Sequence, residues 1–184
     1  MFRKNMRRFA LLTISGQDRP GIVARVSQAL FQAGCNIEDS SMTRLRGEFT
    51  ILLVLQHDQE PGHPSLETFL EPTCRALELD WRLKNLPDVL PPTTSDPDHE
   101  FLIHILGADK PGIVYRVTDL LATASVNIVD LCTRIAGKPE RPIYAMTIEV
   151  EIPGDPEQLQ ERLTQLAHQL GIEITLRAST VVTF

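Results

Sequence analysis

Hydrophobic residues follow the same succession of spacings twice along the chain. Each succession begins with alternating apolar residues, at 9–15 and 101–106, and such alternation predicts a half-buried strand. Apolar residues then recur at every third or fourth position, with neighbours on the same stripe, over residues 22–33 and 113–124. This spacing is typical of an amphipathic helix. Each repeat therefore begins with a strand followed by a helix.

The rest of each repeat predicts a hairpin, a second helix and a last strand. The second helix begins near Pro64 in the first repeat and near Asp155 in the second. Asp155 and Pro156 are typical of a helix start, and Gly171 is typical of a helix end. Pro72 interrupts the pattern in the first repeat, so we expect a kink or a late start there. The predicted strands are 37–45, 49–56 and 80–86 in the first repeat and 128–135, 143–152 and 172–179 in the second, with a tight hairpin turn at 46–48 and a longer one at 136–142.

The predicted order of elements is βαββαβ in both repeats. The simplest packing of this order is one antiparallel sheet with both helices on a single face, which gives an α+β fold of two ferredoxin-like modules. Leu11, Thr13, Leu102, His104 and Leu106 then lie on the other face and are too apolar for a surface in water. We therefore expect sheet faces or edges to join between the two halves or between two chains, and we expect a homo-oligomer.

The two repeats are also alike residue by residue. Residues 16–39 and 107–130 align without a gap at an offset of 91, and thirteen of their 24 positions are identical. Each repeat has the length of a small folding unit. Four prolines lie between the repeats and favour an extended linker. We predict domains at residues 1–86 and 99–184, joined by a proline-rich linker at 87–98.

Charge and composition narrow the classes of function. The chain has 184 residues and a net charge of −6, and its only basic cluster lies between residues 3 and 8. Duplex binding normally needs a larger basic surface, so we expect no direct contact with nucleic acid. No run approaches the roughly 20 apolar residues that span a bilayer, and we expect no membrane partner. Cys35, Cys74 and Cys132 form no CxxC pair, which favours free thiols in the cytoplasm.

No residue pattern demands catalysis. The five histidines have no HExxH spacing, and no serine or cysteine lies in a recognisable nucleophile motif. We therefore predict no catalytic residue, no metal site and no cofactor.

The best-matched polar feature is the turn before each first helix, Asp-[Arg/Lys]-Pro-Gly-Ile-Val. Proline lacks an N–H and glycine lacks a Cβ, so the first-turn N–H groups are left accessible. Such groups, at the positive end of a helix, form a receptor for a carboxylate. Asn36 and Asn127, just past each helix, offer a donor and an acceptor for the rest of a free amino acid. The alternative is that Asp18 and Asp109 cap the helix and that the other residues only shape the turn.

The candidate ligand-binding residues are Asp18, Pro20, Gly21, Ile22, Val23, Asn36 and Ile37 in the first repeat, and Asp109, Pro111, Gly112, Ile113, Val114, Asn127 and Ile128 in the second.

This turn, the helical stripe and the Asn-Ile pair that opens the next strand resemble the ACT domain, a βαββαβ module that binds amino acids and regulates other proteins. The resemblance covers about residues 8–86 and 99–184. It implies an effector bound where two modules meet, against the loop after the first strand and the start of the first helix. The repeats differ at Cys35 and Val126 and at the residue before each, so the two sites need not bind equally.

Three functions remain open at this point. The leading hypothesis is a non-enzymatic regulator that senses a small amino acid, glycine or serine, and acts on a protein partner, by resemblance a transcription activator. The second is the detached regulatory subunit of an amino-acid or folate-linked enzyme. The third is an oligomerisation module that binds no ligand.

Overall fold

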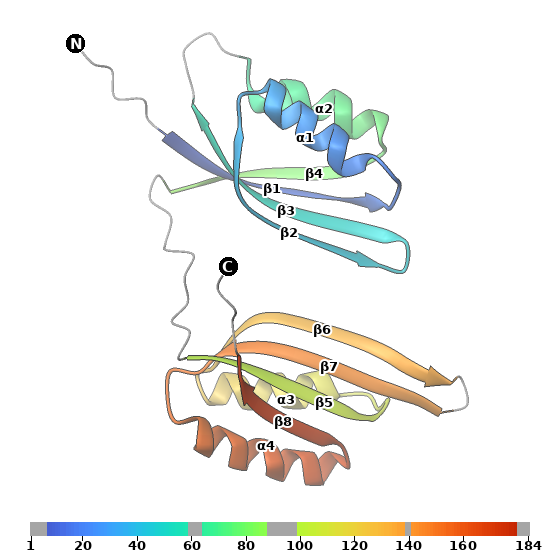
Figure 1. Cartoon of the computed structure of the whole chain (residues 1–184), viewed down its shortest axis with the longest axis vertical. Helices are drawn as coiled ribbons and strands as arrows, with labels where there is room; N and C mark the ends of the chain where they lie inside the picture. Colours follow the sequence, from blue (N-terminus) through green and yellow to red (C-terminus); the bar gives the residue numbers. More distant parts are fainter. Residues whose placement is uncertain (1–6, 59–63, 88–98, 139–140, 180–184) are drawn as a thin grey trace, which may run out of the picture. The chain divides into compact units, whose positions relative to one another are not determined.

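The computed structural model describes residues 7–58, 64–87, 99–138 and 141–179. The chain divides into two compact units, Met1–Pro91 and Pro92–Phe184. We call the described part of the first unit module 1 and that of the second unit module 2. The predicted α+β fold with two ferredoxin-like modules is confirmed (Figure 1). Nearly all of the predicted linker lies outside the described residues, and the domain bounds stay a prediction.

Both modules have the order βαββαβ. Module 1 consists of β1 (Arg7–Gln17), α1 (Ile22–Gln32), β2 (Asn36–Leu45), β3 (Glu48–Asp58), α2 (Leu66–Ala76) and β4 (Asp80–Leu86). Module 2 consists of β5 (Glu100–Ala108), α3 (Ile113–Thr123), β6 (Asn127–Lys138), β7 (Arg141–Glu151), α4 (Pro156–Leu170) and β8 (Glu173–Ala178). Across the described parts of the chain, no helix combines the length and apolar character needed to cross a membrane.

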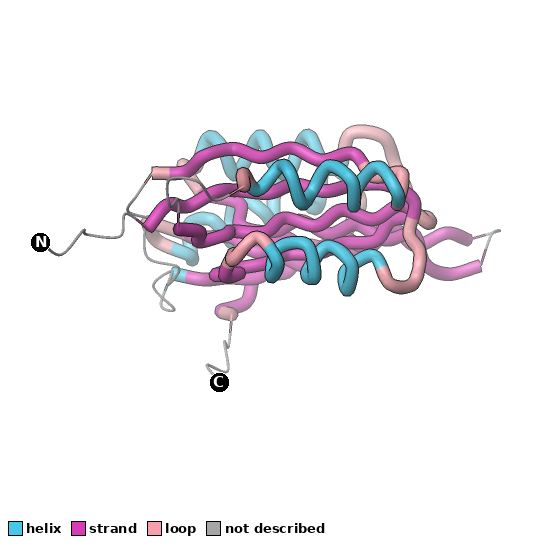
Figure 2. Tube along the Cα trace, turned by 90° about the horizontal axis from the view of Figure 1, so that it is seen from above, coloured by secondary structure: helices cyan, strands magenta, loops and turns pink. Residues whose placement is uncertain are grey.

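Each module contains one antiparallel sheet. The strand order is β2-β3-β1-β4 in module 1 and β6-β7-β5-β8 in module 2, so β2 and β6 occupy equivalent sheet edges. Both helices of a module cover the same face of its sheet (Figure 1). The helices run roughly along the strands (Figure 2). The first helix of each module therefore lies on the sheet with its start beyond the end of the first strand.

The core of each module lies between its helices and the covered face of its sheet. Leu12 and Ile14 of β1 are fully buried there with Val26 and Leu30 of α1. The equivalent stripe in module 2 includes Val117, and its cluster is separate from that of module 1. The predicted apolar stripes are therefore the residues that hold each helix on its sheet.

The other face of each sheet is partly apolar, as the alternation predicts. Leu11, Thr13, Leu102 and His104 are half-buried, and Leu106 is exposed. The joining of these faces or of the sheet edges to another module stays a prediction.

Two local predictions require correction. α2 begins at Leu66 and continues through Pro72 to Ala76, so the alternative of a late start is wrong, while the alternative of a kink at Pro72 stays a prediction. Strand pairing in the second hairpin extends through Gly137 with Pro142 and Lys138 with Arg141, where the sequence predicts a long turn. By contrast, α4 begins and ends as predicted, because the Asp155 carboxylate accepts the Glu157 N–H at 2.9 Å and Gly171 adopts a left-handed conformation.

Candidate functional site

The first helix of each module begins at a glycine in the left-handed conformation. Gly21 has φ 94° and ψ −6°, and Gly112 has φ 92° and ψ 0°. L residues avoid this region because Cβ comes too close to the backbone, so the motif needs glycine for its backbone angle. The sequence pattern predicts a different reason for the glycine, namely access for an approaching group. The structure supports that second reason as well, since a Cβ at either position would have no heavy atom within 4 Å.

No side chain caps either helix. Neither α1 nor α3 has a side-chain hydrogen bond at its N-cap or an acidic residue in its first turn. The alternative in which Asp18 and Asp109 cap the helices is therefore wrong. The N–H groups of Arg25 and Arg116 are the first that donate to the N-cap carbonyl, at 3.0 Å and 2.9 Å. The N–H groups before them cannot be paired within a helix and lie at its positive end.

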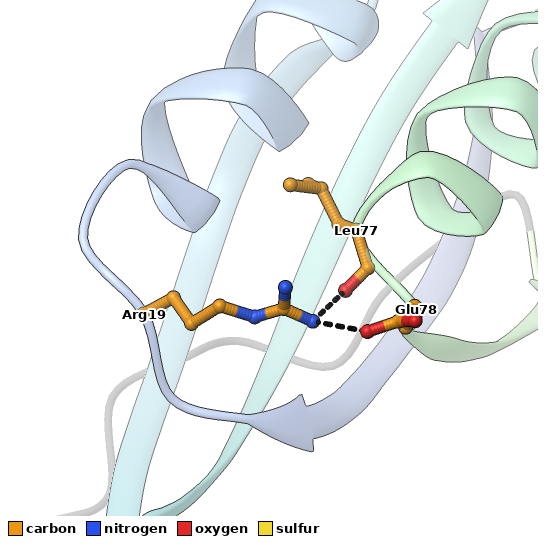
Figure 3. A network of polar contacts seen from close by, with 3 residues as sticks. All are labelled: Arg19, Leu77 and Glu78. Carbon is orange, nitrogen blue, oxygen red and sulfur yellow. Dashed lines mark hydrogen bonds and ion pairs between the residues drawn. The ribbon is translucent and has the colours of Figure 1, made fainter.

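The cation of each motif holds the entrance turn against the second helix. Arg19 donates to the Leu77 carbonyl at 2.8 Å and forms an ion pair with Glu78 at 2.9 Å (Figure 3). Lys110 donates to the Leu170 carbonyl at 2.9 Å in module 2. A cation at this position also complements the negative end of the second helix. The sequence motif alone does not reveal this role, because the carbonyls that these cations bind lie about 60 residues further on.

The acidic residue of the motif has different surroundings in the two modules. The Asp18 N–H donates to the Gly47 carbonyl at 2.8 Å, and its carboxylate pairs with the Arg44 guanidinium at 3.1 Å. In module 2, burial and the negative charge of Asp109 together raise the pKa of the Tyr144 phenol. Arg44 therefore brings a guanidinium near the first entrance, a feature that sequence reasoning missed because β2 is remote from the motif.

The asparagines lie at the other end of the first helix. Asn36 pairs with Gln56, whereas Gln17, just before the entrance turn, pairs with Glu48. The eleven residues of α1 separate Asn36 from Gly21 by about 16 Å, at about 1.5 Å per residue. One amino acid cannot bridge the two within a module. The expectation that they bind one ligand together therefore fails for a single module.

Both asparagine amides already donate to carboxylates. Asn36 Nδ2 lies 2.8 Å from Glu38 Oε1, and Asn127 Nδ2 lies 3.0 Å from Glu151 Oε2. These bonds direct the amide nitrogen toward the protein and leave the amide oxygen as the acceptor for a ligand. An asparagine amide oxygen beside a carboxylate favours the binding of an ammonium group.

The apolar candidates divide into core and surface residues. The side chains of Ile22 and Ile113 are buried in the cores. Val23 and Val114 are exposed. Of the remaining candidates, Pro20, Pro111 and Ile37 are exposed and Ile128 is half-buried.

The fold and these entrances define a tandem βαββαβ protein with an open helix start in each module. Residues 8–84 and 99–177 match the ACT domain, so the chain belongs to the ACT domain family. The resemblance carried by the Asp-[Arg/Lys]-Pro-Gly-Ile-Val turn is thereby confirmed.

Among individual proteins, the chain is similar to the glycine cleavage system transcriptional repressor of Escherichia coli (strain K12). The two are 31% identical over 132 residues, which cover 68% of this chain and 64% of the repressor. The crystal structure of an unknown protein from Galdieria sulphuraria has a TM-score of 0.78 and 25% identity, and covers 95% of this chain and 99% of its own. A crystal structure described as a candidate glycine cleavage system transcriptional repressor shares the fold, with a TM-score of 0.66 and 24% identity over 94% of this chain and 97% of its own.

Proposed function

We propose that this protein is a regulator, without catalytic activity of its own, that binds a free amino acid between two ACT modules and passes the binding to a protein partner. The observation that carries the proposal is the pair of uncapped helix entrances with open space beside their N-cap glycines. A carboxylate there would accept the first-turn N–H groups and face the positive end of the helix.

The ammonium group of the same ligand requires an acceptor from another module. Asn36 and Asn127 supply an amide oxygen beside a carboxylate, but each lies one helix length from its own entrance. Two modules whose first helices run antiparallel would place the asparagine of one beside the entrance of the other. The edge strands β2 and β6, which begin at these asparagines, offer unpaired backbone groups for such an assembly. The proposal is the same whether the two modules belong to one chain or to two copies of the chain.

Ligand binding at this seam would favour one arrangement of modules over another. A differential affinity of about 1–3 kcal/mol is enough for a regulatory response. The similarity to a transcriptional repressor supports control of transcription, and the net charge of −6 favours action through a protein over direct contact with DNA. We therefore propose a transcription activator as the partner and glycine or serine as the first amino acids to test.

Calorimetry of the full chain against all twenty amino acids tests the site. Replacing Asn36 by Leu removes the acceptor for the ammonium group and should weaken binding about tenfold or more, the usual cost of a hydrogen bond to a charged group. Asn85→Leu, on the opposite edge strand β4, is the matched control and should bind as the parent does. Absence of binding by any amino acid would reject the sensor. If substitution of Asn36 and Asn127 leaves the affinity unchanged, the proposed site between two modules is wrong.

Light scattering with and without the bound amino acid tests the assembly, and recovery of bound proteins tests the partner. A DNA-binding activator supports the proposal. A catalytic polypeptide recovered in its place would assign the chain to the regulation of an enzyme.

A further inference from the structure

Module 1 contains a cavity of about 110 Å³ between α1 and the β2–β3 hairpin. Its lining has no charged side chain. The first two residues of α1 contribute to it, so the cavity begins within one turn of the open helix entrance. Its buried floor consists of Ile22, Val26, Phe49, Ile51 and Leu53.

The cavity exists because the edge strand β2 has a small residue, Ser40, where a larger side chain would fill the space. Ser40 pairs with Leu53 and lies on the covered face of the sheet, in the same row as Met42. A register shift between Ile37 and Asp39 sets this row, since the bulge turns the following side chains toward the helix. Ser27 of α1 and Ser40 line the cavity with the exposed Val23 and Ile37. The exposed part of the lining therefore includes Val23, two residues after the N-cap Gly21, and Ile37 in β2.

Module 2 has the same backbone register and larger side chains. Leu131 pairs with Ile148 as Ser40 pairs with Leu53, and each pair follows an equivalent bulge. Tyr144 stands at the position of Phe49. The side chain that would fill the cavity is thus present in module 2 and absent from module 1.

We propose that this cavity receives the branched aliphatic side chain of the amino acid whose carboxylate binds at the α1 entrance. The inference rests on the proposed function and narrows its ligand at module 1 to the valine, leucine and isoleucine class. A dry cavity of about 150 Å³ holds benzene, so 110 Å³ suits an aliphatic group of three or four carbons. An apolar lining favours such a group over the hydrogen or hydroxyl of glycine or serine.

Calorimetry of the full chain with glycine, serine, alanine, valine and leucine tests this preference. Valine or leucine should bind about tenfold or more tightly than glycine. Ser40→Leu, which introduces the residue of module 2, should remove the preference for valine over glycine. Ser41→Leu is the matched control, because Ser41 pairs with Leu52 on the opposite face of the sheet.

The outcomes separate the two proposals. Ser40→Val, a smaller change, repeats the test if Ser40→Leu disturbs the fold, as judged by circular dichroism. If amino acids bind but glycine binds as tightly as valine, or if filling the cavity leaves the order of affinities unchanged, the cavity is a packing gap and the side-chain site is wrong while the sensor stands. If no amino acid binds the parent, both proposals fail.

Discussion

The two modules share a backbone at the helix entrance and differ in the side chains around it. The φ angles of Gly21 and Gly112 differ by only two degrees, and neither helix has a side-chain cap. Yet Arg44 pairs with Asp18 in module 1, while in module 2 burial and the charge of Asp109 raise the pKa of the Tyr144 phenol. The repeated motif thus specifies the shape of the entrance, and the second and third strands specify its chemistry.

Because the modules share a backbone and differ in side chains, each module serves as a control for the other. Its single tryptophan, Trp81, lies in β4 of module 1, and both tyrosines, Tyr115 and Tyr144, lie in module 2. Tryptophan fluorescence therefore follows the unfolding of module 1, tyrosine absorbance follows that of module 2, and far-ultraviolet circular dichroism follows both. Paired substitutions can be compared within one polypeptide.

The largest expected difference concerns Gly16 and Gly107, which lie two residues before the aspartate of each motif. A Cβ at Gly107 would lie 2.5 Å from Ile172 Cγ2 and 2.9 Å from its Cβ, whereas a Cβ at Gly16 would lie 2.7 Å from the end of the flexible Leu79 side chain. Gly107→Ala should therefore destabilise module 2 by about 2–3 kcal/mol, and Gly16→Ala should destabilise module 1 by about 1 kcal/mol. Denaturant unfolding followed by the two probes measures both losses.

The double variant provides the control, since the two losses should add if the modules unfold separately. Equal losses at the two positions would mean that Ile172 moves as readily as Leu79, and the entrance turns would then be equally tolerant.

Equal effects in the two modules, smaller than that of Gly107→Ala, are expected at the N-cap glycines. Gly21→Ala and Gly112→Ala introduce no contact within 4 Å, so their cost is the strain of a positive φ, about 1–2 kcal/mol in each module. The same denaturant unfolding measures it. Gly154→Ala, where φ is not positive and the space is also open, should cost less. A loss confined to one module would show that the two entrances differ in backbone as well as in side chains.

The sequence was sufficient for the fold because each element carries its own local signal. Alternation located β1 and β5, and the caps Asp155 and Gly171 gave the ends of α4 within a residue. Local signals also gave the open helix entrances. They also allowed Asp18 as a helix cap, and this alternative is wrong because the Asp18 carboxylate pairs with Arg44 of β2.

The parts that could not be predicted depend on distance and register. The separation of Asn36 from Gly21 follows from the length of α1, so it can be predicted from the sequence. The cavity beside Ser40 would not, because the bulge after Ile37 decides which side chains of β2 face the helix. Sequence similarity between the repeats hides this difference, since a serine and a leucine at one position change neither the spacing nor the motif.

The smallest expected effect is a pH dependence of module 1 that arises at Cys35. Burial raises the pKa of the Cys35 thiol to about 11, against 9.0 for an exposed thiol, and module 2 has Val126 at this position. Below pH 9 the thiol is protonated in both the folded and unfolded states and adds no pH dependence. Between pH 9 and 11 the unfolded thiol ionises while the folded thiol stays protonated, so stability should fall as pH rises.

Cys35→Val removes this titration and matches module 2. The free energy of unfolding of module 1, followed by Trp81 fluorescence, should decline more steeply from pH 9 to 11 in the parent than in the variant. Cys74, whose pKa burial also raises, is common to both proteins and cancels in the difference. If the difference in free energy of unfolding between parent and variant stays constant from pH 8 to 11, the Cys35 thiol ionises equally in the folded and unfolded states. Burial would then not raise the pKa of this thiol above that of an exposed one.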